Sequence, residues 1–161
     1  FKSTRGRGGV VENIYINNIN MINIPNEPLL FDLFYGGKGA GEESEEDLLN
    51  RMKTAIPPVT EETPAFRNIH ISNIVCRGSG RAMFFNGLPE MPIQNVTVKD
   101  VVITDAAEGA VISQADGVTL ENIHIQAAKG ATVELKSAKN IKVEGVFYKE
   151  IDAKGKSINK K

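Results

Sequence analysis

The chain has 161 residues, enough for one domain, and its 19 basic and 20 acidic side chains nearly cancel. The sequence therefore predicts no overall field that would attract nucleic acid. No apolar run approaches the roughly 20 residues that a membrane-spanning helix needs, so we expect no membrane partner. The single cysteine, Cys76, cannot form an intrachain disulfide, and its place in an apolar run predicts a buried core thiol.

A short Asn-Ile-x-Ile unit returns along most of the chain. Residues 68–71, 95–98 and 122–125 carry close copies at intervals of 27 residues, residues 13–16 lie 55 residues before the first of them, and residues 140–143 follow the last after 18. A repeat of this length is typical of stacked structural units rather than of one globular core. Two apolar strand runs with glycine corners in each period favour parallel strands, with one turn of the chain per period. We therefore predict an all-β fold, a right-handed parallel β-helix (a solenoid) of about five to six rungs.

The chain opens with a basic segment. Residues 1–9 contain Lys2, Arg5 and Arg7 and no acid, which gives a local charge of +3 ahead of a predicted glycine turn. Residues 10–24 follow as the first repeat core, with alternating isoleucines that we expect to point inward.

An acidic insert interrupts the repeat pattern. After a turn at residues 25–28 and a strand predicted over residues 29–37, the segment 38–64 carries three basic and seven acidic side chains, a net charge of 3 − 7 = −4. A capping box followed by leucines at helical spacing predicts one short helix over residues 45–53. We expect this insert to loop out of the stack, which resumes at Phe66.

Asn18, Asn73 and Asp100 share one place in successive repeats, where the strand must bend. Asn and Asp tolerate left-handed backbone, so the pattern predicts a ladder of side-chain amides at a corner. Asn95 fits a glycosylation sequence, yet we interpret it as a structural repeat residue. By the same 27-residue period, His70 and His124 fall at one repeat position, which predicts outward-facing scaffold residues. The polar, basic tail, residues 154–161, is expected to fray.

The Asn-Ile-x-Ile repeat, the opening Lys-Ser strand before a glycine-rich basic turn, and the next strand ending in Tyr35 together resemble the C-terminal half of glycoside hydrolase family 28, the polygalacturonase family. The resemblance covers nearly the whole chain. It implies inverting hydrolysis of a pectic, galacturonan-type polysaccharide, in which one carboxylic acid protonates the leaving oxygen while a carboxylate base activates a water. It also implies no cofactor, no metal, and a secreted or periplasmic location.

The resemblance assigns roles to individual residues. Lys2 matches the lysine of the family's Arg-Ile-Lys motif, which binds the sugar carboxylate, and Tyr35 matches a substrate-contacting tyrosine. Arg5 and Arg7 are further candidates for binding the acidic polysaccharide. The alternatives are a solvated basic terminus for Lys2 and packing under the insert for Tyr35.

The family's catalytic motifs do not occur in this sequence, which lacks Asn-Thr-Asp, Asp-Asp and Gly-His-Gly. Asp32 and Asp116 are isolated acids with no visible partner. We therefore predict no catalytic residue here. The resemblance places the catalytic aspartates upstream of Phe1, so the chain is expected to be one β-helix domain, the C-terminal fragment of a longer enzyme, and inactive alone.

A different class of function shares every fold argument. A non-enzymatic, tailspike-like β-helix that binds carbohydrate or serves in assembly would also lack a catalytic set. In either case an uncovered first rung exposes unpaired backbone groups, which predicts self-association through residues 1–24.

Overall fold

The computed structural model describes residues 1–35, 56–146, 148–151 and 157–160. All regular structure in this part of the chain is β-strand, which confirms the predicted all-β class, while the helix predicted over residues 45–53 lies outside the described residues. The strands are β1 (Val10–Ile24), β2 (Leu29–Asp32), β3 (Ala65–Asn86), β4 (Ile93–Lys139), β5 (Lys142–Glu144), β6 (Tyr148–Ile151) and β7 (Ser157–Lys160).

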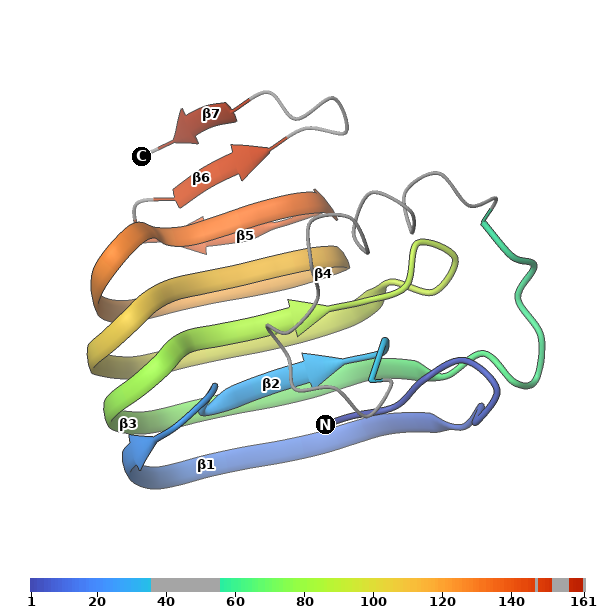
Figure 1. Cartoon of the computed structure of the whole chain (residues 1–161), viewed down its shortest axis with the longest axis horizontal. Helices are drawn as coiled ribbons and strands as arrows, with labels where there is room; N and C mark the ends of the chain where they lie inside the picture. Colours follow the sequence, from blue (N-terminus) through green and yellow to red (C-terminus); the bar gives the residue numbers. More distant parts are fainter. Residues whose placement is uncertain (36–55, 147, 152–156, 161) are drawn as a thin grey trace.

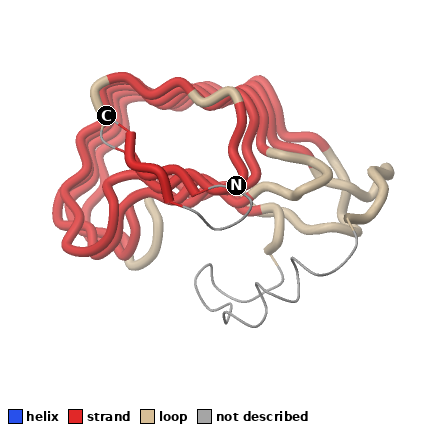
Figure 2. The backbone as a smooth tube through the Cα atoms, turned by 90° about the horizontal axis from the view of Figure 1, so that it is seen from above, coloured by secondary structure: helices blue, strands red, loops and turns tan. Residues whose placement is uncertain are grey.

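The strands form one sheet with the order β1-β3-β4-β6-β7, in which β2 also pairs with β3 and β5 also pairs with β4. Every pair is parallel except β6 with β7. Ile14 of β1 lies beside Ile69 of β3, and Ile69 lies beside Val96 of β4. Successive lengths of one chain are therefore superposed, as Figure 1 shows from the side and Figure 2 from above.

Each of these superposed lengths of chain is here called a winding. Residues with left-handed backbone conformation form its corners. In β1, Asn13, Asn18 and Asn23 have φ values of 57°, 58° and 55°, five residues apart, and the next winding repeats the spacing. Asn73 Nδ2 donates to Asn18 Oδ1 at 3.2 Å, and Asn95 Nδ2 donates to Asn68 Oδ1 at 3.2 Å. Asparagine is among the few residues that adopt this conformation readily, and its amide bonds the residue stacked on it. The predicted amide ladder and the structural role of Asn95 are confirmed.

The repeat period is not constant, and one predicted alignment is wrong. Between the windings of β3 and β4 the offset is 27 residues, since Ile69 pairs with Val96. In the next winding Asn122 Nδ2 donates to Asp100 Oδ1 at 2.6 Å, an offset of 22 residues, and a Cβ at Gly117 would lie 2.8 Å from Asn95 Oδ1. Asn122 therefore stacks on Asp100, and Gly117 takes the position above Asn95.

The histidines consequently do not share a repeat position. His70 lies one residue after Ile69 and pairs with Thr97, whereas His124 belongs to the five-residue unit that begins at Asn122. Each winding holds two consecutive five-residue units of similar Asn-Ile-x-Ile-x pattern. The same residue types therefore recur in two different columns of stacked side chains. Both histidines are exposed, as predicted, but they lie in different columns.

The interior contains columns of branched and aromatic side chains. Ile69, Val96 and Val118 are fully buried and represent one such column, and Cys76 is fully buried as well. This burial confirms the predicted core cysteine, and it raises the pKa of the Cys76 thiol. The Phe31 ring packs against Phe85 with centroids 4.6 Å apart. Buried area of this kind supplies most of the stability of such a stack.

Two element boundaries differ from the sequence prediction. The strand predicted over residues 29–37 ends at Asp32, because the Asp32 carboxylate accepts a hydrogen bond from Phe34 N at 3.0 Å and turns the chain. The tail was expected to fray, yet Ser157–Lys160 pairs with β6 through backbone bonds that do not depend on polar side chains. Of the predicted insert, residues 56–64 are described; they form no strand, and Glu62 O accepts bonds from Gly6 N and Gly8 N.

Candidate functional site

Lys2 and Tyr35 come together on one wall of the winding. The opening residues pair with the end of β2, since Ser3 N donates to Asp32 O at 2.8 Å and Asp32 N donates to Phe1 O at 3.0 Å. Tyr35 N then donates to Ser3 O at 2.9 Å. As a result Lys2 Nζ lies 4.4 Å from the centroid of the Tyr35 ring, so the structure brings together two residues that are far apart in sequence.

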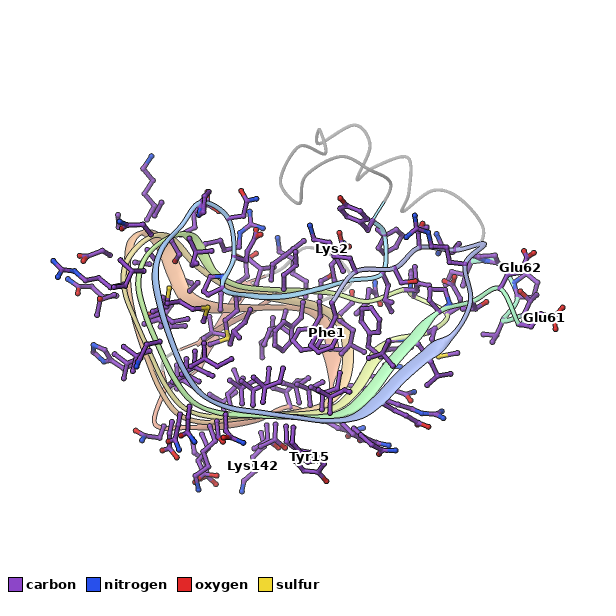
Figure 3. The ribbon with its side chains drawn as sticks, turned by 90° about the horizontal axis from the view of Figure 1, so that it is seen from below. Phe1, Lys2, Tyr15, Glu61, Glu62 and Lys142 are labelled. Atoms are coloured by element: carbon purple, nitrogen blue, oxygen red, sulfur yellow. The ribbon has the colours of Figure 1, made fainter. Side chains whose placement is uncertain are left out.

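The ammonium group of Lys2 has no carboxylate partner among the described residues. Lys2 is exposed. Its neighbour Phe1 points the other way, into the interior, where its ring stacks on Phe31 with centroids 4.9 Å apart (Figure 3). This anchor fixes the backbone of Lys2. A cation over an aromatic face can pair with an anion while the ring supports a sugar.

Arg5 lies nearby but already has a carboxylate partner. Arg5 Nε and Nη2 lie 2.5 and 2.9 Å from the two carboxylate oxygens of Glu90, whose side chain is only 4% exposed. The same guanidinium lies over the Phe34 ring, 5.0 Å from its centroid. The hydrogen bond from Arg5 lowers the pKa of Glu90. Arg5 therefore clamps the opening turn to the loop that carries Glu90.

Arg7 is exposed in the turn that follows. Its backbone N donates to Thr4 O at 3.2 Å, and no described contact joins its side chain to Lys2 or Tyr35. The three cations of the basic segment thus have different surroundings. Lys2 lies over Tyr35, Arg5 is paired with Glu90, and Arg7 is exposed in a turn.

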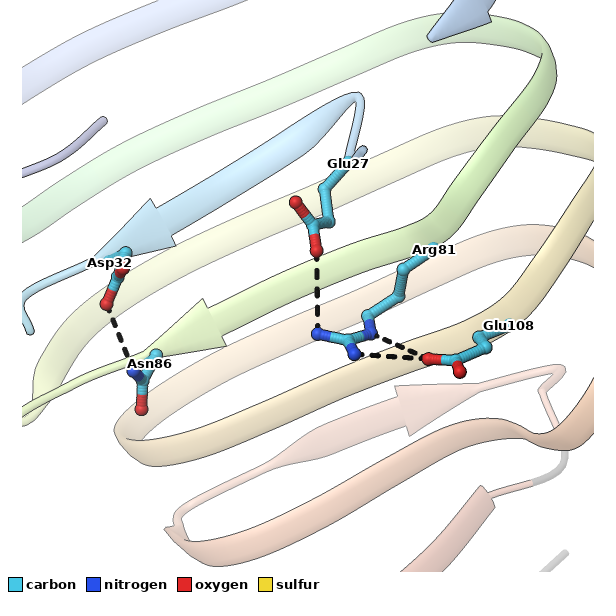
Figure 4. A network of polar contacts seen from close by, with 5 residues as sticks. All are labelled: Glu27, Asp32, Arg81, Asn86 and Glu108. Atoms are coloured by element: carbon cyan, nitrogen blue, oxygen red, sulfur yellow. Dashed lines mark hydrogen bonds and ion pairs between the residues drawn. The ribbon is translucent and has the colours of Figure 1, made fainter. Parts of the chain in front are cut away.

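A charged row next to this site was missed by the sequence interpretation. Arg81 lies between Glu27 and Glu108, with Nη1 3.5 Å from Glu27 Oε1 and Nη2 3.1 Å from Glu108 Oε2 (Figure 4). The Arg81 guanidinium also covers the Phe84 ring, 4.8 Å from its centroid. The separations of 54 and 27 residues equal the offsets between neighbouring windings, so correct column alignment could have identified this row.

Glu27 is the unusual member of the row. Its side chain is 3% exposed, and its Oε2 atom has no hydrogen-bond partner among the described residues. Burial raises the pKa of Glu27, and the charges of Arg81 and Lys2 only partly oppose this effect. Smaller contributions come from Lys2, which lowers the pKa of Glu27, and from Asp32, which raises it.

Asp32 is the second acid on this wall. It is 4% exposed, and its Oδ1 accepts hydrogen bonds from Phe34 N and from Asn86 Nδ2, both at 3.0 Å (Figure 4). Asp32 Oδ1 is thus bonded to two protein groups, whereas Glu27 is buried beside Arg81 with one carboxylate oxygen unpaired among the described residues.

The opposite wall carries a different exposed feature. Tyr15, 73% exposed, stacks on His70 with centroids 4.9 Å apart, and Figure 3 places Tyr15 and Lys142 across the winding from Lys2. A shallow cavity of about 310 Å³ opens at a corner near Ser79, Asp105 and Gln126, and it includes none of the predicted site residues.

Among the described residues, no group of three or more histidine, cysteine, aspartate or glutamate side chains is arranged to hold a metal ion. No described segment is a helix with the length and apolar character needed to cross a membrane. Comparison of the chain with protein-family models, with curated proteins and with solved structures finds no match, so the resemblance to family 28 glycoside hydrolases stays a prediction.

Proposed function

We propose that this chain is the C-terminal part of a right-handed parallel β-helix of about five to six rungs that acts on a galacturonan-type polysaccharide. Parallel pairing of successive windings, with corners at equivalent residues, supports the solenoid. The single observation that carries the function is Lys2 Nζ over the Tyr35 ring, exposed and without a carboxylate partner among the described residues.

This pair suits the chemistry of a uronate. The Lys2 ammonium can donate charge-assisted hydrogen bonds to a sugar carboxylate. The Tyr35 ring, half-buried and held by the bond from its own backbone to Ser3, offers an apolar face against which a pyranose can pack. A neutral or methyl-esterified sugar would retain the second contact and lose the first.

In this proposal, hydrolysis is inverting and its carboxylates come from residues outside this chain. Asp32, the acid that pairs with Lys2 along the backbone, supports that division, because its Oδ1 binds Phe34 N and Asn86. The 161-residue chain is therefore expected to bind oligogalacturonate without cleaving it, in a secreted or periplasmic setting.

The proposal is tested with the Lys2→Ala variant and two ligands, trigalacturonate and its methyl ester. Calorimetric titration is expected to give about tenfold weaker binding of the free acid, as one charge-assisted bond is lost. Binding of the ester should stay within about twofold. Lys142→Ala, on the opposite wall, is the matched control and should bind both ligands as the unaltered chain does. Equal losses for acid and ester would remove Lys2 from this role.

A second candidate is a non-enzymatic, tailspike-like β-helix that binds acidic carbohydrate or serves in assembly. The observation that favours it is the burial of Asp32 and Glu27 against protein partners. A reducing-end assay on the protein encoded by the whole gene separates the two. Release of new reducing ends from polygalacturonate supports the hydrolase, and binding without release supports the alternative.

A further inference from the structure

Asp32 is a buried acid whose carboxylate is bonded by two neutral protein groups. No lysine or arginine lies within ion-pair distance of its carboxylate in the described part of the chain, although the residue is 4% exposed. Burying a charged group is costly unless hydrogen bonds compensate. The compensation here comes from Phe34 N and Asn86 Nδ2, each 3.0 Å from Asp32 Oδ1.

The backbone of Asp32 holds the segment that carries Lys2. Asp32 O accepts from Ser3 N at 2.8 Å, and Asp32 N donates to Phe1 O at 3.0 Å. These two bonds flank Lys2 on either side, so the position of the Lys2 Cα depends directly on the position of Asp32.

The side chain of Asp32 holds the segment that carries Tyr35. By accepting from Phe34 N, it turns the chain immediately after β2 and directs Tyr35 N to Ser3 O, 2.9 Å away. Asp32 therefore connects both halves of the cation–π pair. An aspartate bonded to the backbone two residues later is a common turn device, and here it sets the separation of two side chains.

Asn86 fixes Asp32 from the neighbouring winding. It pairs with Asp32 across β2 and β3, its side-chain Nδ2 donates to the Asp32 carboxylate, and its backbone carbonyl oxygen accepts from Leu33 N at 2.9 Å. The residue is 5% exposed. One asparagine thus holds both ends of the turn that follows β2.

We propose that Asp32 and Asn86 are positioning residues that hold Lys2 over Tyr35 in the arrangement that binds a uronate carboxylate. This inference rests on the proposed function for its ligand, and on the hydrogen bonds of Asp32 and Asn86 for its mechanism. Asp32 acts through the oxygen that accepts from Phe34 N, so an isosteric amide at this position should keep the geometry, whereas removal of the oxygen should release it.

The test measures the ring-current shift of the Lys2 ε protons by NMR and the affinity for trigalacturonate by calorimetry. In Asp32→Ala the Lys2 shift should move toward its random-coil value, and affinity should fall about tenfold. Asp32→Asn should keep the shift and should bind within about threefold. Asp105→Ala, an exposed acid at another corner, is the control and should change neither quantity.

Asn86→Ser is the second variant, because Ser113 holds the equivalent position one winding later and a serine is tolerated there. It should move the Lys2 shift in the same direction while the resonances of Ile69 and Val96 stay in place. Loss of the core resonances together with the Lys2 shift, or an unchanged Lys2 shift in Asp32→Ala, would overturn the proposal. If the unaltered chain does not bind trigalacturonate, the proposed function fails, while the Lys2 shift still tests the positioning.

Discussion

At the scale of single residues, Glu27 shows how burial in the fold changes the pKa of a carboxyl group. The carboxyl is 3% exposed, one of its oxygens has no partner among the described residues, and its pKa is raised chiefly by burial. A buried acceptor left without a bond costs about 1–3 kcal/mol. The 3.5 Å separation from Arg81 Nη1 offers only weak compensation.

The pH dependence follows from the direction of this shift. Because the pKa of Glu27 is higher in the folded chain than in the unfolded chain, its contribution to stability is fully present below the unfolded pKa, about 4.3, and is lost as pH rises through the folded pKa. Glu27→Gln should therefore raise the free energy of unfolding by about 1 kcal/mol at pH 7, and the gain should disappear near pH 4.

Urea denaturation at several pH values measures this difference. Glu108→Gln, at the exposed end of the same row, is the control and should stay within about 0.5 kcal/mol of the unaltered chain. A gain for Glu27→Gln that grows as pH falls would show that the sign is wrong.

At the scale of elements, the sequence was sufficient for the strand class and the corners but not for every alignment. Asn18, Asn73 and Asp100 were placed correctly because a left-handed corner admits few residue types. Asn122 was assigned to the wrong column, because two consecutive five-residue units with the same pattern occur in each winding and the sequence alone does not distinguish their columns. Hydrogen bonds between windings distinguish them, as the bond from Asn122 to Asp100 demonstrates.

The candidate site was only partly predictable for the same reason. Lys2 and Tyr35 came from family resemblance, and the structure places them in contact. Glu27, Arg81 and Asn86 were not identified, and Asp32 was noted only as an acid without a visible partner. Their contacts depend on which windings are neighbours and on burial that the local sequence does not encode.

Arg5 gives a prediction at this scale, since it joins two elements. Arg5→Ala should lower the free energy of unfolding by about 1 kcal/mol at pH 7, because the bidentate pair with Glu90 is lost from a partly exposed position. It should leave the affinity for trigalacturonate within about twofold. Denaturation and calorimetry measure the two quantities, and Arg7→Ala is the control for loss of charge.

The lowered pKa of Glu90 fixes the pH window of this effect. A carboxyl whose pKa is lower in the folded state stabilises the protein above its unfolded pKa, and the contribution is lost as pH falls through the folded pKa. The stability difference between Arg5→Ala and the unaltered chain should therefore shrink in acid. A drop in affinity as large as that of Lys2→Ala would instead make Arg5 a binding residue.

At the scale of the whole molecule, β1 is an edge strand of the described sheet. It pairs with β3 on one side, and Val10, Tyr15, Ile19 and Ile22 are exposed along it. Its 15 residues contain one charged side chain, Glu12, which is paired with Arg67. Long, weakly charged edges favour pairing with another chain.

We therefore expect the isolated chain to self-associate through this end. Light scattering should show an average mass that rises with concentration, and Ile22→Lys should reduce the rise because a lysine disfavours edge pairing. Val102→Lys, in a strand with neighbours on both sides, is the control and should leave association unchanged. A monomer at all concentrations would contradict this expectation.

The central claim is that the wall carrying Lys2 and Tyr35 binds a uronate. The most direct measurement is an NMR titration of the isotopically labelled chain with trigalacturonate, read residue by residue. We expect saturable shifts at residues 1–3 and 32–35, with the Tyr15 and Lys142 wall unchanged. Shifts confined to the opposite wall, or no saturable shift at any residue, would contradict it.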